Sequence, residues 1–199
     1  MNRLHVALGR VPRPALFAVA GLIQIAVIGA IVIDRASILR RGTEVTLDTR
    51  PVDPRDLLRG DYVQLRYRIS NVRLDGLAGT PSKGRDTPIF VKLAPNADGF
   101  YEAVSAHLAP VPLADREVLI KGRVASGFNC GGNVSTFCAT ADVAYGIERY
   151  FVPEGEGRAI EAARNEGKVS VVAAVTPDGR AAIKRLLIDG KPVYDEPLF

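Results

Sequence analysis

An uncharged stretch near the amino terminus, residues 15–33, constrains this chain more than any other feature. Its one strongly polar side chain is the amide of Gln24. A helix rises about 1.5 Å per residue, so this stretch spans about 28 Å, close to the hydrocarbon thickness of a bilayer. A helix in a soluble core would carry a polar face, and this stretch has none. We therefore predict a transmembrane anchor over residues 15–33, with a short tail (1–14) before it and a juxtamembrane linker (34–42) after it.

The anchor is expected to stay attached to the mature chain and to direct the export of the domain after it. Its apolar run is longer than the roughly 7 to 15 residues of a cleaved signal peptide, which favours an uncleaved signal anchor. Arginines flank both ends, so the positive-inside rule does not decide the orientation. The tail is short, and the two cysteines lie in the domain after the anchor, where thiols pair if it is outside the cytoplasm. We expect a cytoplasmic amino terminus and an extracytoplasmic domain over residues 43–199.

Charge and composition exclude one class of partner for this domain. The whole chain has 199 residues and a formal net charge of +4, and its arginines are scattered along the sequence. A nucleic-acid-binding protein concentrates Lys and Arg on one element with aromatic residues between them. The sequence contains no such stripe, so we expect no nucleic-acid partner.

The domain has the pattern of short strands separated by turns. Residues 61–70 alternate polar and apolar side chains, as a half-buried strand does. Asp-Gly pairs at 98–99 and 178–179 predict two β-hairpins. Strands are expected at 43–49, 61–70, 89–93, 100–106, 118–125, 141–147, 168–176, 180–188 and 192–195, a loop at 71–88, and one short helix at 158–166 that ends at Gly167. This order predicts a mainly β fold: an antiparallel sandwich or partly open barrel behind a single transmembrane helix.

One octapeptide and two further segments carry a family resemblance. The octapeptide is Gly60-Asp61-Tyr62-x-x-Leu65-x-Tyr67. It resembles the signature of the GDYXXLXY family of bacterial membrane-anchored proteins. Residues 150–155 (Tyr-Phe-Val-Pro-Glu-Gly) and 193–196 (Val-Tyr-Asp-Glu) are also similar to that family. The resemblance implies one anchor in a bacterial inner membrane and a periplasmic domain, and it implies no particular activity.

The octapeptide has a structural and a functional interpretation. In the structural one, Gly60 lets the backbone turn sharply into a strand, and Leu65 and Tyr67 enter the core. In the functional one, charged and aromatic side chains around it form a recognition surface for a protein or a polar ligand. The candidate binding residues are Asp53, Arg55, Asp56, Arg59, Asp61 and Tyr62. Glu154 either caps the following helix or joins this surface.

The two cysteines, Cys130 and Cys138, are expected to form a structural disulfide. The loop between them contains two glycines and closes easily, and such a bond contributes roughly 2 to 3 kcal/mol. A metal pair would need further cysteines or histidines, and the chain has only His5 and His107. We therefore expect no metal and no cofactor.

The sequence carries no standard catalytic motif. One enzyme hypothesis is a signal-peptidase-like hydrolase, with Ser37 beyond the anchor as nucleophile and Lys92 as its base. An Arg-Gly-Asp turn at 59–61 fits that hypothesis, but the proline-rich serine motif of those peptidases is missing. The leading hypothesis is a non-enzymatic, membrane-tethered module that binds a protein partner, itself expected to be a membrane protein. The alternative is a domain for a small polar molecule or glycan, whose pocket would be lined by Tyr62, Tyr101, Tyr145 or Tyr150.

Overall fold

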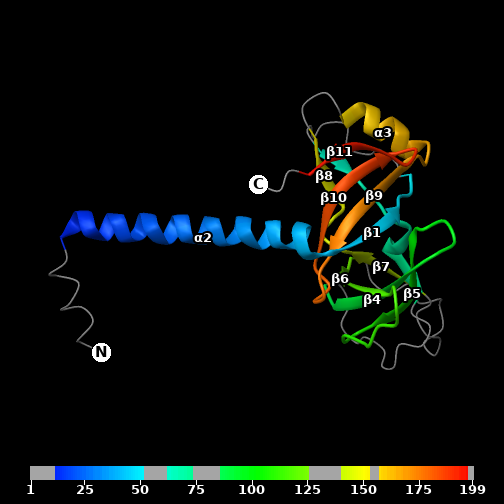
Figure 1. Cartoon of the computed structure of the whole chain (residues 1–199), viewed down its shortest axis with the longest axis horizontal. Coiled ribbons are helices and arrows are strands. Elements are labelled where there is room, and N and C mark those ends of the chain that lie inside the picture. Colours follow the sequence, from blue (N-terminus) through cyan, green and yellow to red (C-terminus); the bar gives the residue numbers. More distant parts are fainter. Residues whose placement is uncertain (1–11, 52–61, 74–85, 126–139, 153–156, 197–199) are drawn as a thin grey trace. The chain divides into compact units, whose positions relative to one another are not determined.

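The structure is a computed structural model, and it describes residues 12–51, 62–73, 86–125, 140–152 and 157–196. The chain divides into two compact units, one extending to Ser37 and one beginning at Ile38. The first unit is helical, and the second is a β-rich domain (Figure 1).

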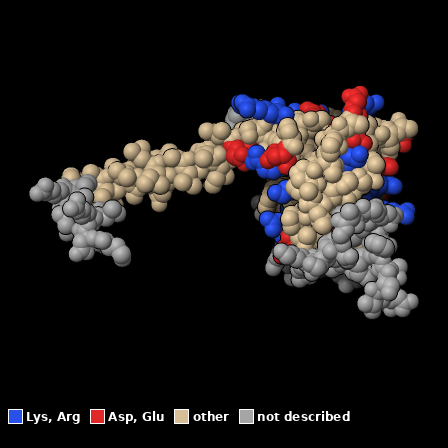
Figure 2. Space-filling view, turned by 90° about the horizontal axis from the view of Figure 1, so that it is seen from below, with Lys and Arg blue, Asp and Glu red and all other residues tan. Residues whose placement is uncertain are grey.

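Helix α2 runs without a break over Arg13–Arg41. In the described part of the chain it is the one helix that is long and apolar enough to cross a membrane, over Pro14–Arg41. Figure 2 shows uncharged atoms over most of its length. The helix includes the predicted anchor and continues through the segment expected to be a linker, where the Ser37 hydroxyl donates a hydrogen bond to the Asp34 carbonyl (2.7 Å).

The last turn of α2 belongs to the packing of the domain. A small buried cluster joins it to the next sheet, and its members are Ile38, Leu39, Ala174 and Ala182. At Gly42 a Cβ atom would lie 2.7 Å from the Ile38 carbonyl oxygen and 2.8 Å from the Val175 nitrogen. Both neighbours are backbone atoms that cannot move aside cheaply, so this junction requires glycine.

The first sheet of the domain is antiparallel and four-stranded (Figure 1). Its strands are β1 (Thr43–Asp48), β9 (Val169–Val175), β10 (Ala181–Ile188) and β11 (Lys191–Asp195), in the order β1-β9-β10-β11. Every residue of β9 is buried. Such a continuous apolar strand is typical of a position covered on both faces.

The second sheet is antiparallel and five-stranded. Its strands are β3 (Asn71–Arg73), β4 (Pro88–Pro95), β5 (Tyr101–His107), β6 (Val118–Val124) and β7 (Thr140–Ala144), in the order β3-β7-β6-β4-β5. The predicted hairpin forms between β4 and β5, with Gly99 at φ +86° in its turn. The turn of the other predicted hairpin joins the two sheets, because the Gly179 carbonyl accepts a hydrogen bond from the Lys121 nitrogen of β6 (2.8 Å).

A two-stranded ribbon and a short helix complete the domain. The ribbon pairs β2 (Tyr62–Gln64) with β8 (Arg149–Phe151), and helix α3 spans Gly157–Asn165. The predicted helix is thus confirmed, and Gly167 comes after it at φ +71°, the left-handed conformation common after a helix C-terminus. One apolar core takes residues from both sheets, the ribbon and α3. The mainly β, antiparallel fold class with one long apolar helix and one short helix is confirmed.

Three elements differ from the sequence prediction. The strand expected over 61–70 ends at Gln64, and Arg68–Ser70 form a single 3₁₀ turn (η1). The turn is closed by a backbone hydrogen bond from the Ser70 nitrogen to the Tyr67 carbonyl (3.0 Å). Polar and apolar residues still alternate there because extended backbone outside a sheet alternates as well. Strand β3 lies within the predicted loop, and β8 was not predicted, since three-residue strands leave almost no periodic signal.

Candidate functional site

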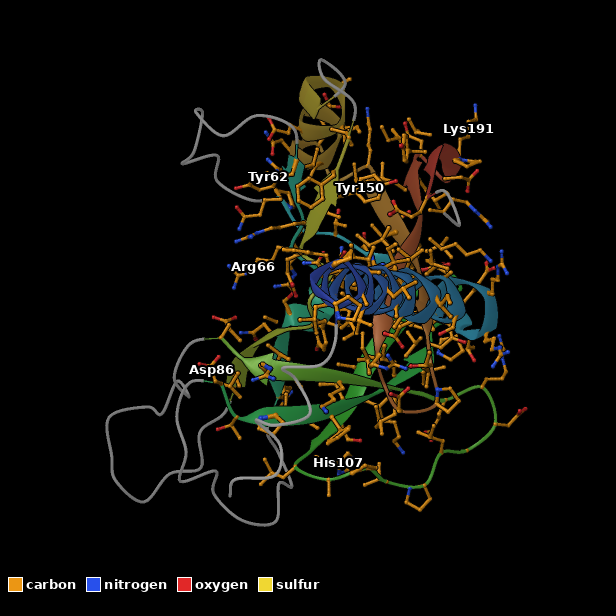
Figure 3. All side chains as sticks on the ribbon, turned by 90° about the vertical axis from the view of Figure 1, so that its left-hand side faces the viewer. Tyr62, Arg66, Asp86, His107, Tyr150 and Lys191 are labelled. Carbon is orange, nitrogen blue, oxygen red and sulfur yellow. The ribbon has the colours of Figure 1, made fainter. Side chains whose placement is uncertain are left out.

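The ribbon β2–β8 brings together two segments that are far apart in the sequence. Tyr62 lies opposite Phe151, Val63 opposite Tyr150, and Gln64 opposite Arg149. Figure 3 shows Tyr62 and Tyr150 close together below α3. The described end of the octapeptide therefore pairs directly with residues 149–151.

The inner face of the octapeptide is part of the core. Val63, Leu65 and Tyr67 are buried, on the face that the alternation predicts. The Tyr67 hydroxyl donates a 2.6 Å hydrogen bond to the Ile147 carbonyl. Burial, with the Glu148 carboxylate as a second cause, raises the pKa of Tyr67 well above its usual value of 10.0. Tyr67 is thus a neutral donor that ties the octapeptide to the segment before β8.

The turn between β7 and β8 is held to the octapeptide by further hydrogen bonds. The Tyr145 hydroxyl donates to the Ile69 carbonyl (2.5 Å), and the Leu65 nitrogen donates to the Glu148 carbonyl (2.8 Å). The Glu148 carboxylate accepts from the backbone of Gly146 (2.9 Å), which orders the turn itself. Burial raises the pKa of Tyr145, with Glu148 again the second cause. The backbone next to the ribbon is therefore held both by hydrogen bonds to the octapeptide and by hydrogen bonds within the turn.

A buried arginine on α3 covers the open edge of β2. The Arg164 guanidinium donates to the Gln64 carbonyl at 2.7 Å and to the Asn165 side chain at 3.0 Å, and the residue is only 2% exposed. An uncovered strand edge offers free carbonyls for unwanted pairing, and a charged donor closes this one. Sequence reasoning missed this role. The sequence does contain one indication: Arg164 lies four residues after Ile160, so on a helix the two side chains share one face, and an apolar Ile160 predicts that this face is buried.

The outer face of the ribbon carries an exposed cluster. The rings of Tyr62 and Phe151 lie 6.0 Å apart at 56°, and the Arg149 guanidinium lies 5.8 Å from the centre of the Tyr62 ring. Phe151 is 68% exposed, more than any other large apolar side chain in the described part of the domain. We call Tyr62, Arg149 and Phe151 the ribbon patch. Tyrosine and arginine are the side chains most enriched at binding hot spots, and phenylalanine is common in interface cores.

Tyr150 links the ribbon to the carboxyl-terminal strand. Its ring meets that of Tyr194 edge-on, with 5.6 Å between centroids and an angle of 80°. Its hydroxyl is buried, and no hydrogen-bond partner lies among the described residues. Burial, followed by the nearby Glu196, raises the pKa of Tyr150. All three segments that carry the sequence resemblance, in β2, β8 and β11, therefore meet at the ribbon.

Comparison with known proteins confirms the family resemblance. The GDYXXLXY protein family matches residues 24–186. The chain belongs to that family. No curated protein and no solved structure matches the chain. Within the described part of the GDYXXLXY signature, Leu65 and Tyr67 are buried in the core, whereas Tyr62 is half-buried on the outer face of the ribbon.

All the charged residues proposed around the GDYXXLXY signature, together with Gly60, lie outside the described residues. These are Asp53, Arg55, Asp56, Arg59, Gly60, Asp61 and Glu154. Cys130 and Cys138 lie outside them too, so the disulfide stays a prediction. Within the described ranges, no group of three or more His, Cys, Asp or Glu side chains could hold a metal ion.

The residues of the hydrolase hypothesis are each engaged elsewhere. The Ser37 hydroxyl donates to the backbone of α2. The Lys92 ammonium pairs with the Glu117 carboxylate at 3.1 Å, whereas a lysine base must be held neutral. Both residues of the hydrolase hypothesis thus contact groups other than each other, and no described contact joins Ser37 to Lys92.

The tyrosines proposed to line a ligand pocket have different surroundings. Tyr145 and Tyr150 are buried in the core, 6% and 2% exposed. Tyr62 is half-buried on the ribbon, and Tyr101 belongs to β5 of the five-stranded sheet. The ribbon patch contains one of the four.

Proposed function

We propose that this protein is a membrane-anchored interaction module whose ribbon patch binds a protein partner. Helix α2 anchors it, its amino terminus faces the cytoplasm, and the domain lies on the periplasmic side of a bacterial inner membrane. The partner is itself a membrane protein, since anchoring confines both proteins to one surface and raises their effective concentration.

The observation that carries the proposal is the exposure of Phe151 beside Tyr62 and Arg149. Two aromatic rings on a hydrogen-bonded ribbon lose little conformational freedom on binding, which lowers the entropic cost of an interface. The described contact of Arg149 is the Tyr62 ring, so its guanidinium can still pair with a carboxylate across an interface. The patch therefore fits a partner that presents an apolar side chain next to an acidic one.

Buried residues behind the ribbon patch support the proposal because they hold its backbone in a fixed position. Arg164, Tyr67 and Tyr145 all hold backbone carbonyls of this region by hydrogen bonds from buried side chains. A binding surface on rigid backbone needs no ordering when the partner arrives, whereas a surface on a loop does.

Site-specific photo-crosslinking in cells tests the proposal. A photoreactive phenylalanine analogue would replace Phe151 in one strain and Val193 in another. Val193 is a matched control, since it is an exposed apolar residue (51%) on a different strand. We expect a protein adduct from position 151 that is absent from position 193 and is lost in the Arg149→Glu variant.

Three controls make the result interpretable. Carbonate extraction would show whether each variant is anchored, protease accessibility in spheroplasts would show its orientation, and thermal unfolding would show that Arg149→Glu is folded. Equal adducts from both positions, or none from either in anchored and folded protein, would refute protein binding at the ribbon patch. Glycan adducts from position 151 alone would instead favour the ligand-binding alternative.

A further inference from the structure

The outer face of the five-stranded sheet gathers basic residues that are scattered in the sequence. On β4 and β6, Phe90 lies opposite Lys121, and Pro88 lies opposite Arg123. Lys92, two residues after Phe90, points to the same face. We call Lys92, Lys121 and Arg123 the basic face. Lys121 and Arg123 alternate along β6, and the pairing of β4 with β6 brings Lys92 to the same surface, a grouping that no single segment of the sequence shows.

In the described part of the chain, two cations of the basic face lack the carboxylate partners that cations of the four-stranded sheet have. On the four-stranded sheet Lys184 pairs with Glu44 at 2.6 Å, and Arg185 pairs with Asp195 at 2.8 Å. Lys121 and Arg123 are both exposed, and within the described residues neither pairs with a carboxylate. The described contact of Lys121 is with the Phe90 ring, 5.8 Å from its centroid. The basic face therefore has positive charge that its own sheet does not neutralise.

Three acidic groups close to this face are already engaged. Glu117 accepts a backbone hydrogen bond from Ala114 and pairs with Lys92, and these contacts lower its pKa. In the turn beside Lys121, Asp178 pairs with Arg180 at 2.7 Å. On β7, the Asp142 carboxylate accepts from Arg66 at 2.9 Å and from Asn71 at 3.3 Å. None of them compensates Lys121 or Arg123.

Two further polar side chains border the cations. The Ser105 hydroxyl and the His107 Nε2 of β5 lie 2.8 Å apart, and Ser105 and His107 lie opposite Lys92 and Phe90. A hydroxyl and an imidazole next to ammonium groups suit the oxygens of a phosphate. In Figure 3, His107 lies at the opposite end of the domain from Tyr62, so this surface is separate from the ribbon patch.

We propose that the basic face binds the phosphate groups of anionic phospholipid headgroups. The cations are spread along a sheet surface and do not close around one point, which suits many phosphates in a plane better than one enclosed ion. The proposal rests on the membrane anchoring in the proposed function, since anchoring keeps the domain close to a bilayer at all times. Each basic side chain near an anionic leaflet then increases the equilibrium constant for docking by about fivefold.

Lysine footprinting of the full chain in nanodiscs tests this inference. Discs of phosphatidylcholine alone and discs that also contain phosphatidylglycerol would be exposed to an acylating reagent, and the modified lysines would be quantified by mass spectrometry. We expect Lys121 to react several-fold more slowly in the anionic discs and to regain its reactivity at high salt. Lys191, an exposed lysine of β11 in the other sheet, is the internal control and should react equally in both.

Charge variants sharpen the test. Arg123→Gln should weaken the protection of Lys121 by about fivefold. The matched change Arg185→Gln, which removes a cation already paired with Asp195, should leave it unchanged.

Several results would overturn the lipid assignment. Equal reactivity of Lys121 in both kinds of disc is one, and equal protection by inorganic phosphate in phosphatidylcholine discs is another. Protection that requires an added acidic membrane protein would assign the face to a protein instead. If Lys121 is unprotected while Phe151 still crosslinks, this inference fails and the proposed function stands. If carbonate releases the chain from membranes, the anchoring itself fails.

Discussion

The two sheets of this domain differ in how far their strands are buried and in whether their exposed cations pair with carboxylates. In the four-stranded sheet, β9 is buried along its whole length, and the cations of neighbouring β10 pair with carboxylates. In the five-stranded sheet, the outer side of β4 and β6 is open, and Lys121 and Arg123 lack such pairs within the described residues.

This difference separates scaffold from surface. Burial on both faces provides the free energy that holds a strand in place. Local ion pairs reduce the attraction of the paired side chains for other charged groups. An open face with uncompensated cations contributes little to stability but attracts anions over about a Debye length. Binding should therefore be sought on the five-stranded sheet and the ribbon.

The largest predicted effect concerns the joint between the sheets. Gly179 has φ +86°, and a Cβ there would lie 3.0 Å from the Lys121 nitrogen. Gly179→Ala should lower the free energy of unfolding by about 2 to 4 kcal/mol, because strain and crowding add. Denaturant unfolding of the full chain in detergent would measure this loss, with the near-UV circular dichroism of the tyrosines as the signal. Gly190→Ala, at φ +74° with open space around it, should lose only about 1 kcal/mol. Equal losses would show that crowding at the joint contributes nothing.

The next largest effect is a difference in stability loss between substitutions at two buried tyrosines, Tyr67 and Tyr150. Tyr67→Phe removes the donor to the Ile147 carbonyl and should cost about 1 to 3 kcal/mol of stability. Tyr150→Phe removes a buried hydroxyl without a described partner and should change stability by less than about 0.5 kcal/mol, or increase it. The same unfolding measurement serves both. A large loss in Tyr150→Phe would mean that its hydroxyl binds a residue outside the described ranges or an ordered water.

A smaller effect compares cations between the sheets. Lys184→Gln breaks an ion pair with Glu44 and should cost about 0.2 to 1 kcal/mol, less at high salt. Lys121→Gln removes a cation that pairs with no carboxylate among the described residues, and it should leave stability nearly unchanged. Thermal melts at low and high ionic strength would compare them. A cost for Lys121→Gln equal to that for Lys184→Gln would contradict the division into scaffold and surface.

The smallest effect is a dependence on pH within the four-stranded sheet. The hydrogen bond and charge of Lys184 lower the pKa of Glu44 from its usual 4.5. A lowered pKa in the folded state means that the ion pair contributes stability above pH 4.5, and that this contribution is lost as pH falls through the folded-state pKa. The stability of the wild type should fall more steeply with acid than that of Lys184→Gln. Parallel curves from about pH 6 to about pH 3 would contradict the role of this pair.

Sequence reasoning succeeded where a local rule was sufficient. The Asp-Gly turns, the alternation around Leu65 and Tyr67, and the apolar helix each depend on residues close together in the chain. It failed where pairing between distant segments decides the outcome. Nothing in residues 149–151 indicates a strand until β2 lies beside them.

The candidate sites show the same limit more strongly. Tyr62 was predicted as a binding residue, but Arg149 and Phe151 join it only through the register of the ribbon. The basic face depends on β4 and β6 being neighbours, although more than twenty residues separate them. Such groupings depend on topology, and a single sequence constrains topology only weakly.

The docking of Ile38 and Leu39 has a practical consequence for anyone who wishes to separate the domain from its helix. A shortened chain that starts at the first strand, residue 43, would strip Ala174 and Ala182 of their cover and expose part of β9 and β10 to solvent. Such a protein would tend to self-associate through that bare area. A cut just before Ile38 keeps the natural cover in place, so solubility trials should begin there.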